Sequence, residues 1–285
     1  MQVLAFEAIG TDWRVETAEP LGVDVASAVA ERIEFFDSTW SRFRADSLVA
    51  RIATQPGTWR FSSDAPALFA LYRELYEATD GAVNPLVGRS LERLGYDAAY
   101  SLRPSGTAAP APAWDDAIAW NGESLATIAP VVLDVGAAGK GYLVDLVGDV
   151  LRAHGVDDFV IDASGDIVHA GSGETRVALE HPLDSSKAIG VVALTNGALC
   201  ASASNRRAWG TGLHHVVDAT TGLPTSSVIA TWVMAPTGLV ADGLATGLFF
   251  APAERFAALG DFQWARMFST GRVEHSAQFD GELFL

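Results

Sequence analysis

The segment Leu133–Tyr142 (LDVGAAGKGY) constrains this chain more than any other ten residues. An apolar run at 131–133 ends at Asp134 and enters a turn of glycine and alanine that holds Lys140. Residues 143–151 then follow the apolar spacing of a helix, so the pattern predicts a strand, a turn and a helix. A helix start offers unpaired N–H groups, and glycine lets a ligand approach the backbone closely. The segment therefore favours binding of an anion, most often phosphate.

The same segment fits neither of two common phosphate-binding signatures. A P-loop requires a glycine five residues before its Gly-Lys pair and a Ser or Thr after the lysine. Asp134 and Gly141 hold those two positions here. The segment also departs from the G-x-G-x-x-G pattern of dinucleotide-binding folds. Considered alone, it is also compatible with a tight strand-to-helix turn that merely carries an exposed lysine.

The composition is that of an acidic globular protein. Of 285 residues, 49% are hydrophobic, and the formal net charge of -16 argues against a nucleic-acid partner. The single cysteine, Cys200, rules out an intrachain disulfide and a Cys-based zinc site, and its apolar flanks predict that it is buried. The first residues lack the pattern of a signal peptide, and no apolar run is long enough for a membrane span. A cytoplasmic protein is therefore expected.

Apolar spacing along the rest of the chain predicts an α+β fold with mixed, largely antiparallel sheets and flanking helices. Two strands are expected within 2–17, and helices around 25–36, 68–75 and 237–250. Residues 101–114, rich in Pro, Ala and Ser, predict a flexible surface loop. Further short strands are expected near 159–161, 175–180, 189–195, 198–202, 214–217 and 228–235.

A carboxylate and a hydroxyl share one face of the last predicted helix. Asp242 and Thr246 are four residues apart, so both side chains point to the same side. Carboxylate and hydroxyl oxygens are hard ligands of the kind that Mg²⁺ prefers. Taken alone, an exposed Asp beside a back-bonded Thr is the commoner arrangement. The surrounding residues are apolar, however, and an acid in such surroundings needs a partner.

Three other segments carry polar residues at turns. His215 lies three residues before Asp218, in a polar break between apolar strands, where a general base could stand, although a structural role is commoner. Asn84 directly precedes a helix that begins with proline, and Trp40–Ser47 ends the first long helix. Each of the last two segments, taken alone, is more often part of the fold than of a site.

In this order, the segments resemble the ApbE family of FAD:protein FMN transferases. The resemblance runs from Ile9 to about Phe250, nearly the whole chain. It implies a single large ApbE-like (T-fold-like) domain of two joined lobes across 1–285. The family motifs Asp-x-Gly-Gly-x-Ala-Lys-Gly-Tyr, Gly-Gly-Asp, His-x-x-Asp-Pro-x-Thr-Gly and Ala-Asp-Ala-x-Ala-Thr have counterparts at 134–142, 164–166, 215–222 and 241–246.

The resemblance implies a Mg²⁺-dependent enzyme that transfers FMN from FAD to a Ser or Thr hydroxyl of an acceptor protein. The product is a phosphoester-linked flavin, and AMP is released. The resemblance assigns His215 as catalytic base and Lys140 as a second catalytic group that also contacts FAD. The implied Mg²⁺ ligands are Asp242, Thr246 and the backbone carbonyl of Ala137. The implied FAD-binding residues are Phe43, Ala82, Val83, Asn84, Asp134, Lys140 and Val216.

Some residues depart from the family pattern. Ile9 replaces a Met, which exchanges one apolar contact for another, and Gly139 replaces the Ala before the lysine. Ala219 replaces the Pro after Asp218, so a looser turn is expected there. Residues 202–204 read Ser-Ala-Ser where Ser-Gly-Asp is frequent, which puts a polar contact of the family in doubt.

Two other functions compete with FMN transfer. A pyrophosphatase would use water in place of the acceptor hydroxyl and convert FAD to FMN and AMP. A non-catalytic protein would bind FAD stoichiometrically without turnover. Release of AMP without an acceptor identifies the first, and stable FAD binding without turnover identifies the second.

Overall fold

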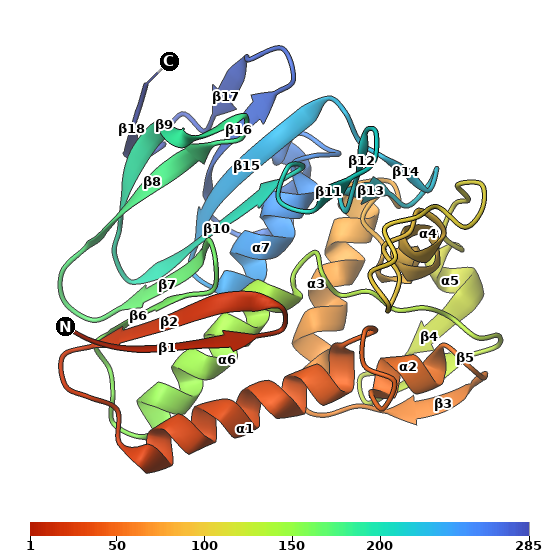
Figure 1. The fold of residues 1–285 in the computed structure, drawn as a ribbon, viewed down its shortest axis with the longest axis horizontal. Helices are drawn as coiled ribbons and strands as arrows, with labels where there is room; N and C mark the ends of the chain where they lie inside the picture. Colours follow the sequence, from red (N-terminus) through yellow and green to blue (C-terminus); the bar gives the residue numbers. More distant parts are fainter. Residues whose placement is uncertain (285) are drawn as a thin grey trace.

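An eight-stranded sheet forms the centre of the molecule, and every neighbouring pair of strands in it is antiparallel (Figure 1). The computed structural model describes residues 1–284. The strand order is β1-β2-β6-β7-β10-β15-β16-β17. The strands are β1 (Gln2–Ala8), β2 (Thr11–Thr17), β6 (Phe159–Asp162), β7 (Asp166–Ala170), β10 (Gly197–Ala203), β15 (Val228–Ala235), β16 (Gln263–Phe268) and β17 (Val273–His275).

Successive residues of the central strands are buried on opposite faces of this sheet. Ile161 and Val233 belong to the large core under the helices, whereas their neighbours Val160 and Trp232 belong to a second core on the other face. This period of two is expected of a strand with an apolar layer on each side. It explains why these segments are apolar almost throughout. Cys200 lies in the helix-side core and is fully buried, as predicted.

Helices cover one face of the sheet, and a smaller sheet covers part of the other (Figure 1). The longer helices are α1 (Val23–Trp40), α3 (Ala65–Ala78), α6 (Gly139–Ala153) and α7 (Gly238–Gly247). The short helices are α2 (Leu48–Ile52), η1 (Pro85–Val87), α4 (Gly88–Arg93), α5 (Trp114–Ala117) and η2 (Ala253–Leu259).

The remaining strands form small sheets around the centre. One is β18-β9-β8, built from β8 (Thr175–His181), β9 (Asp184–Leu194) and β18 (Gly281–Leu283). Another is β3-β5-β4, built from β3 (Gly57–Arg60), β4 (Ile118–Trp120) and β5 (Ser124–Thr127). Two short ladders join β11 (Ala208–Trp209) to β12 (Leu213–His214) and β13 (Val217–Asp218) to β14 (Leu223–Pro224).

The predicted α+β class with largely antiparallel sheets is confirmed, but two predicted strands are wrong. Residues 131–133 are buried but pair with no strand within residues 1–284. Val132 packs against Gly88, and the next N–H, of Asp134, donates to the carbonyl of Pro85 at 2.8 Å. The strand expected near 214–217 is also interrupted, because β12 and β13 pair with different partners.

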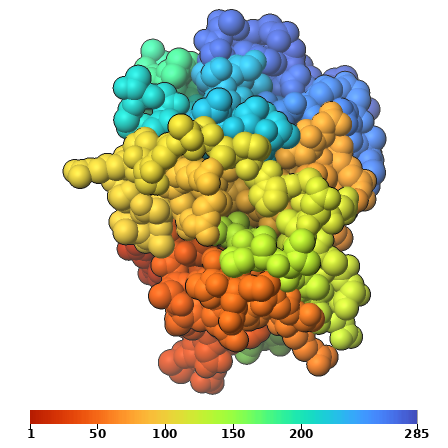
Figure 2. All heavy atoms as spheres, turned by 90° about the vertical axis from the view of Figure 1, so that its right-hand side faces the viewer, coloured from red at the N-terminus to blue at the C-terminus, as the bar shows by residue number. Residues whose placement is uncertain are grey.

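The segment around residue 100 lies on the surface between the N-terminal and C-terminal parts of the chain (Figure 2, yellow). Ser90 Oγ donates to the carbonyl of Ala109 at 2.8 Å, and the N–H of Ala111 donates to the carbonyl of Ala219 at 2.8 Å. These bonds attach part of the predicted loop to its neighbours. Within residues 1–284, no helix combines the length and apolar character needed to cross a membrane.

Candidate active site

Two glycines let α6 and α7 cross at very short range. A Cβ on Gly141 would lie 2.2 Å from the carbonyl oxygen of Gly238, so neither position has room for a side chain. The crossing brings Asp242, on α7, against the first turn of α6. There Asp242 Oδ2 accepts a hydrogen bond of 2.9 Å from the N–H of Gly141. The anion that meets this helix start is therefore the protein's own carboxylate.

Asp145, on α6, binds the first turn of α7. Asp145 accepts hydrogen bonds from the N–H groups of Gly238 and Leu239, at 2.7 and 2.8 Å. The carboxylate thereby caps the start of α7, where unpaired donors and the helix dipole favour a negative charge. Burial nevertheless raises the pKa of Asp145 to about 6, against the opposing effect of these two hydrogen bonds. The crossing that positions Asp242 is thus held by two acids: Asp242 of α7 bonds the start of α6, and Asp145 of α6 bonds the start of α7.

The three predicted metal ligands meet at this crossing. Thr246 Oγ1 lies one turn beyond Asp242 and donates to the carbonyl oxygen of Ala137 at 3.2 Å. Adjacent ligands of octahedral Mg²⁺ lie about 3 Å apart, because each is about 2.0–2.1 Å from the ion. A carboxylate, a hydroxyl and a carbonyl are also hard oxygen donors, so the residues present fit Mg²⁺. No group of three or more His, Cys, Asp or Glu side chains suited to a metal occurs within residues 1–284.

Lys140 is held by an acid and does not extend into solvent. Its Nζ lies 3.0 Å from Oδ2 of Asp166 and donates to the carbonyl oxygen of Ala163 at 2.7 Å. Asp166 is the last residue of the 164–166 motif, and its pairing with Lys140 was not predicted from the sequence. The lysine charge is therefore partly offset before any substrate binds.

Two buried acids face each other beside this lysine. Burial raises the pKa of Asp242 well above its usual range; repulsion from Asp166 adds to the effect and Lys140 opposes it. Burial likewise raises the pKa of Asp166, again against the effect of Lys140. With both acids ionised, two carboxylates and one ammonium group would leave an excess of negative charge in a dry place, which is why both pKa values are raised. A divalent cation would balance it.

Asp134 is anchored from the opposite direction by Arg42. The Nε of Arg42 donates to Asp134 Oδ2 at 2.5 Å, and the N–H of Gly136 donates to Oδ1 at 2.8 Å. Burial would raise the pKa of Asp134, but the Arg42 charge and these hydrogen bonds lower it below its usual value. The carboxylate is therefore ionised at neutral pH. Arg42 also donates to the carbonyl oxygen of Tyr96 at 2.9 Å.

Phe43, the predicted partner of the flavin, is packed among other groups. It stacks on Tyr100 with ring centroids 4.8 Å apart and an interplanar angle of 14°. The guanidinium carbon of Arg42 lies 4.2 Å from the centre of the same ring. Tyr100 and Leu102 adopt φ values of 49° and 52°, a region that non-glycine residues rarely occupy. Tyr100 is also half exposed, so it is the less firmly held of the two partners.

The segment 82–84 is buried and packs beside the turn that follows His215. Asn84 accepts from the N–H of Leu86 at 2.9 Å, which makes it the cap of the short helix that begins at Pro85, and it donates to the carbonyl oxygen of Pro112 at 3.0 Å. The carbonyl oxygen of Ala82 accepts from the N–H of Ala219 at 3.0 Å. This bond fixes the predicted flavin-binding segment, Ala82 to Asn84, to the predicted catalytic turn.

His215 follows β12 and is tied to the strand opposite. Its N–H donates to the carbonyl oxygen of Arg207 at 3.2 Å. Burial, reinforced by the Arg207 charge, lowers the pKa of His215 to about 4, so the ring is neutral at pH 7. The adjacent His214 has a structural role: its Nε2 bonds the carbonyl oxygen of Thr225 at 2.8 Å, and its Nδ1 accepts from the N–H of Val216. Val216 itself is buried.

Unsatisfied polar atoms gather around this region. Six buried side-chain nitrogen or oxygen atoms within residues 1–284 have no hydrogen-bond partner, and four of them belong to Arg42, Asp166 and His215. One of the two Asp166 oxygens, Oδ2, nevertheless forms the ion pair with Lys140. Such orphans are rare in folded proteins and are often completed by a ligand, an ion or water. Their clustering marks the region between α6, α7 and β12 as a ligand site.

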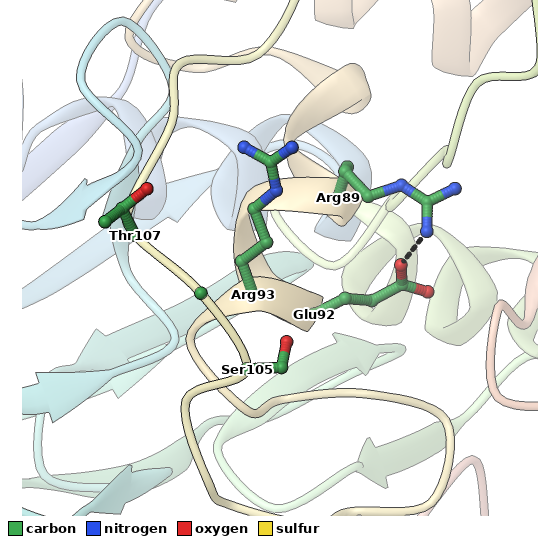
Figure 3. Close-up of a pocket in the computed structure, with 6 residues that line it drawn as sticks. Arg89, Glu92, Arg93, Ser105 and Thr107 are labelled. Atoms are coloured by element: carbon green, nitrogen blue, oxygen red, sulfur yellow. Dashed lines mark hydrogen bonds and ion pairs between the residues drawn. The ribbon is translucent and has the colours of Figure 1, made fainter.

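Two surface clefts lie elsewhere. One, of about 480 Å³, is lined by α4 and the nearby loop, and Figure 3 shows Arg89 paired with Glu92 there at 2.7 Å beside Arg93, Ser105 and Thr107. The other, of about 390 Å³, borders the start of α7 and includes Asp145 and His169. Neither is lined by a residue that the sequence analysis assigned to the site.

Comparison with known proteins gives a consistent result. The model of the ApbE family matches residues 9–265. The FAD:protein FMN transferase of Klebsiella pneumoniae (strain 342) is 29% identical over 280 residues, which cover 89% of this chain and 79% of that protein. The FAD:protein FMN transferase of Vibrio cholerae is 24% identical over 279 residues, which cover 90% of this chain and 84% of that protein.

Solved structures of low sequence identity share the fold. Flavin transferase ApbE from Vibrio cholerae superposes with a TM-score of 0.80 at 21% identity, covering 98% of this chain and 97% of that one. The ApbE protein from Thermotoga maritima also gives 0.80, at 22% identity and 97% coverage of both chains. The fold is therefore that of the ApbE structures, as the resemblance predicted.

Since the family model spans nearly the whole chain, this protein belongs to the ApbE family. It is accordingly an enzyme of the transferase class.

Proposed function

We propose that this enzyme transfers FMN from FAD to a Ser or Thr hydroxyl of an acceptor protein, with Mg²⁺ as cofactor and AMP as the second product. The observation that carries the proposal is the convergence of Asp242, Thr246 and the Ala137 carbonyl at the α6–α7 crossing. Curated relatives across most of this length bear the name of that activity.

In the proposed reaction, the acceptor hydroxyl oxygen attacks the FMN-side phosphorus of FAD. A new P–O bond forms to the acceptor, and the bond from that phosphorus to the bridging oxygen breaks, so that AMP leaves with the electron pair. The hydroxyl proton passes to the neutral ring of His215. A base with a low pKa is charged only briefly and gives its proton up readily afterwards. The ring of His215 is neutral at pH 7, so its free nitrogen can accept that proton.

Other residues bind and orient the substrate in this proposal. Asp134, held ionised by Arg42, receives polar groups of FAD, and Phe43 with the segment 82–84 takes the flavin ring. Lys140 offsets charge on the phosphates, once substrate competes with Asp166 for it. Mg²⁺, when held by Asp242, Thr246 and Ala137, would neutralise charge on the pyrophosphate. In-line phosphoryl transfer needs little beyond such positioning and charge stabilisation.

The test is incubation of the purified protein with FAD and Mg²⁺, with and without an acceptor. We expect covalent FMN on the acceptor and AMP formed in equal amount, with both lost on chelation of the metal. Asp242→Asn and His215→Gln should abolish both products. Asp149→Asn and His275→Gln change exposed residues of the same types and should leave both unchanged. Rapid AMP release without acceptor would instead identify a pyrophosphatase, and bound FAD without turnover a binding protein.

A further inference from the structure

Three cationic side chains border the proposed pyrophosphate site, and only one is not paired with an acid. Lys140 lies 3.0 Å from Asp166, and Arg42 lies 2.5 Å from Asp134. Arg207 has no carboxylate oxygen within 4.0 Å in the part of the chain that the structure describes, residues 1–284.

The backbone holds Arg207 opposite His215. Ala208 and His214 pair across the β11–β12 ladder, and the next bond of this hairpin runs from the N–H of His215 to the carbonyl of Arg207. The side chain is steadied at one point, where Nη1 donates to the hydroxyl of Tyr96 at 2.9 Å. The Tyr96 ring is itself fixed by stacking on Trp209, with centroids 5.5 Å apart.

This arrangement leaves most of the guanidinium donors free. A guanidinium has five N–H donors, and the tyrosine hydroxyl uses one of them. The group remains exposed to solvent, so a ligand can reach it. Its charge nevertheless acts on both His215 and Asp134, whose pKa values it lowers. A planar fork of this kind matches phosphate oxygens in a bidentate contact.

We propose that Arg207 binds a phosphate oxygen of the FAD pyrophosphate directly and stabilises the negative charge that grows there during transfer. The inference rests on the proposed function. It adds to the predicted site a catalytic arginine that the sequence analysis did not identify. Arg207 and His215 lie opposite each other on one hairpin. The hairpin therefore places the phosphate-binding group and the base beside the reacting phosphorus at the same time.

Binding is the first test, because it does not depend on turnover. Arg207→Gln should weaken FAD binding by about 10- to 100-fold, the loss expected for a charge-assisted hydrogen bond. Binding of riboflavin, which carries no phosphate, should be unchanged. Arg207→Lys should recover part of the FAD affinity, since it keeps the charge but loses the fork. Arg206→Gln is the matched control, because this neighbour pairs with Glu180 at 3.0 Å away from the site.

The dependence of kcat/KM on pH provides a second readout. The charged and titratable groups that act on His215 are Arg207, His214 and Asp134. Removing the Arg207 charge should therefore shift the acidic limb of the profile upward, toward the usual pKa of histidine, about 6.5. A merely structural role for Arg207 would not produce this shift.

Either of two results would overturn the proposal: FAD affinity of Arg207→Gln within threefold of wild type, or equal losses of FAD and riboflavin binding. A failure of the proposed function looks different. In that case the wild-type protein transfers no FMN to any acceptor, while the ratio of FAD to riboflavin affinity still decides whether Arg207 binds phosphate.

Discussion

His215 is a neutral imidazole in a buried position, and its neighbours determine how it titrates. Burial and the Arg207 charge lower its pKa to about 4. Between about pH 4 and 6.5 the unfolded chain binds a proton here that the folded chain does not. The neutral, buried ring of His215 therefore contributes fully to the free energy of unfolding above about pH 6.5. This contribution is lost as the pH falls through about 4.

The activity of a general base with this pKa should persist well into the acidic range. We expect kcat/KM for FMN transfer to stay level from neutral pH to about pH 5 and then to fall, with the acidic limb centred near pH 4. Initial rates in overlapping buffers measure this profile, with intrinsic fluorescence as a control for unfolding. An acidic limb centred near pH 6.5 would show that the base is exposed or is another group.

Burying the charge of Asp242 lowers the stability of the fold, although the proposed function requires that charge. A substitution that removes it should therefore affect stability and activity in different ways. Asp242→Asn removes the charge but keeps the shape, so the protein should be at least as stable to urea as wild type. Transfer should nevertheless fall by roughly 100-fold or more, because a charge-bearing metal ligand is gone. Urea unfolding and Mg²⁺ titration by calorimetry measure the two effects. Wild-type Mg²⁺ affinity in the variant would remove Asp242 from the metal site.

The sequence predicted candidate site residues, but it did not predict the partners that hold them. Asp242 and Thr246 were placed on one helix face by their spacing alone, and the structure has them so. The partners of Asp134 and Lys140 were missed. Arg42 is 92 positions from Asp134, and a single sequence contains no record of contacts at that separation. The one available signal was Asp134 itself, because an acid that follows a buried apolar run needs a cationic or hydrogen-bonding partner.

At the scale of elements, the α6–α7 crossing controls the geometry of the metal ligands. Gly141→Ala would place a Cβ 2.2 Å from the Gly238 carbonyl oxygen and 2.6 Å from Cβ of Asp242, so the helices must separate. We expect a loss of about 1–3 kcal/mol in the free energy of unfolding by urea, together with weaker Mg²⁺ binding. Gly22→Ala is the control, since nothing lies within 4 Å of its added Cβ. Unchanged stability of Gly141→Ala would mean that the crossing is looser than described.

The segment that carries Tyr100 covers the ring proposed to hold the flavin. If Phe43 takes the flavin ring, Tyr100 must give up its stacking contact at 4.8 Å. Tyr100→Ala should then tighten FAD binding by about two- to tenfold, the value of one aromatic pair. Flavin fluorescence quenching measures the dissociation constant. Weaker binding in this variant would show instead that Tyr100 itself contacts the flavin.

Elements with strong periodicity were predictable, and those that depend on distant pairing were not. The helices α1, α3 and α6 and the hairpin β1–β2 follow their apolar spacing. The sheet β3-β5-β4 was missed because each of its strands has three or four residues, too few to show a period. The apolar run at 131–133 has the composition of a strand, but it joins no sheet within residues 1–284.

At the scale of the whole molecule, 35 acidic and 19 basic residues repel one another on balance. Raising the ionic strength from about 10 mM to about 1 M shortens the Debye length from about 30 to about 3 Å and screens this repulsion. The thermal midpoint should rise with sodium chloride in the absence of divalent metal. Calorimetric scans measure it. A midpoint that falls with salt would mean that the ion pairs stabilise the fold more than net repulsion destabilises it.

The central claim is that this chain attaches FMN covalently to another protein. Mass spectrometry of candidate flavoproteins, co-expressed with and without this chain, tests it most directly. We predict a Ser or Thr that carries FMN through a phosphoester only when the wild-type chain is present, and not with the Asp242→Asn or His215→Gln variant. Flavin attachment that is the same with and without the chain, or that persists with both variants, would contradict the claim.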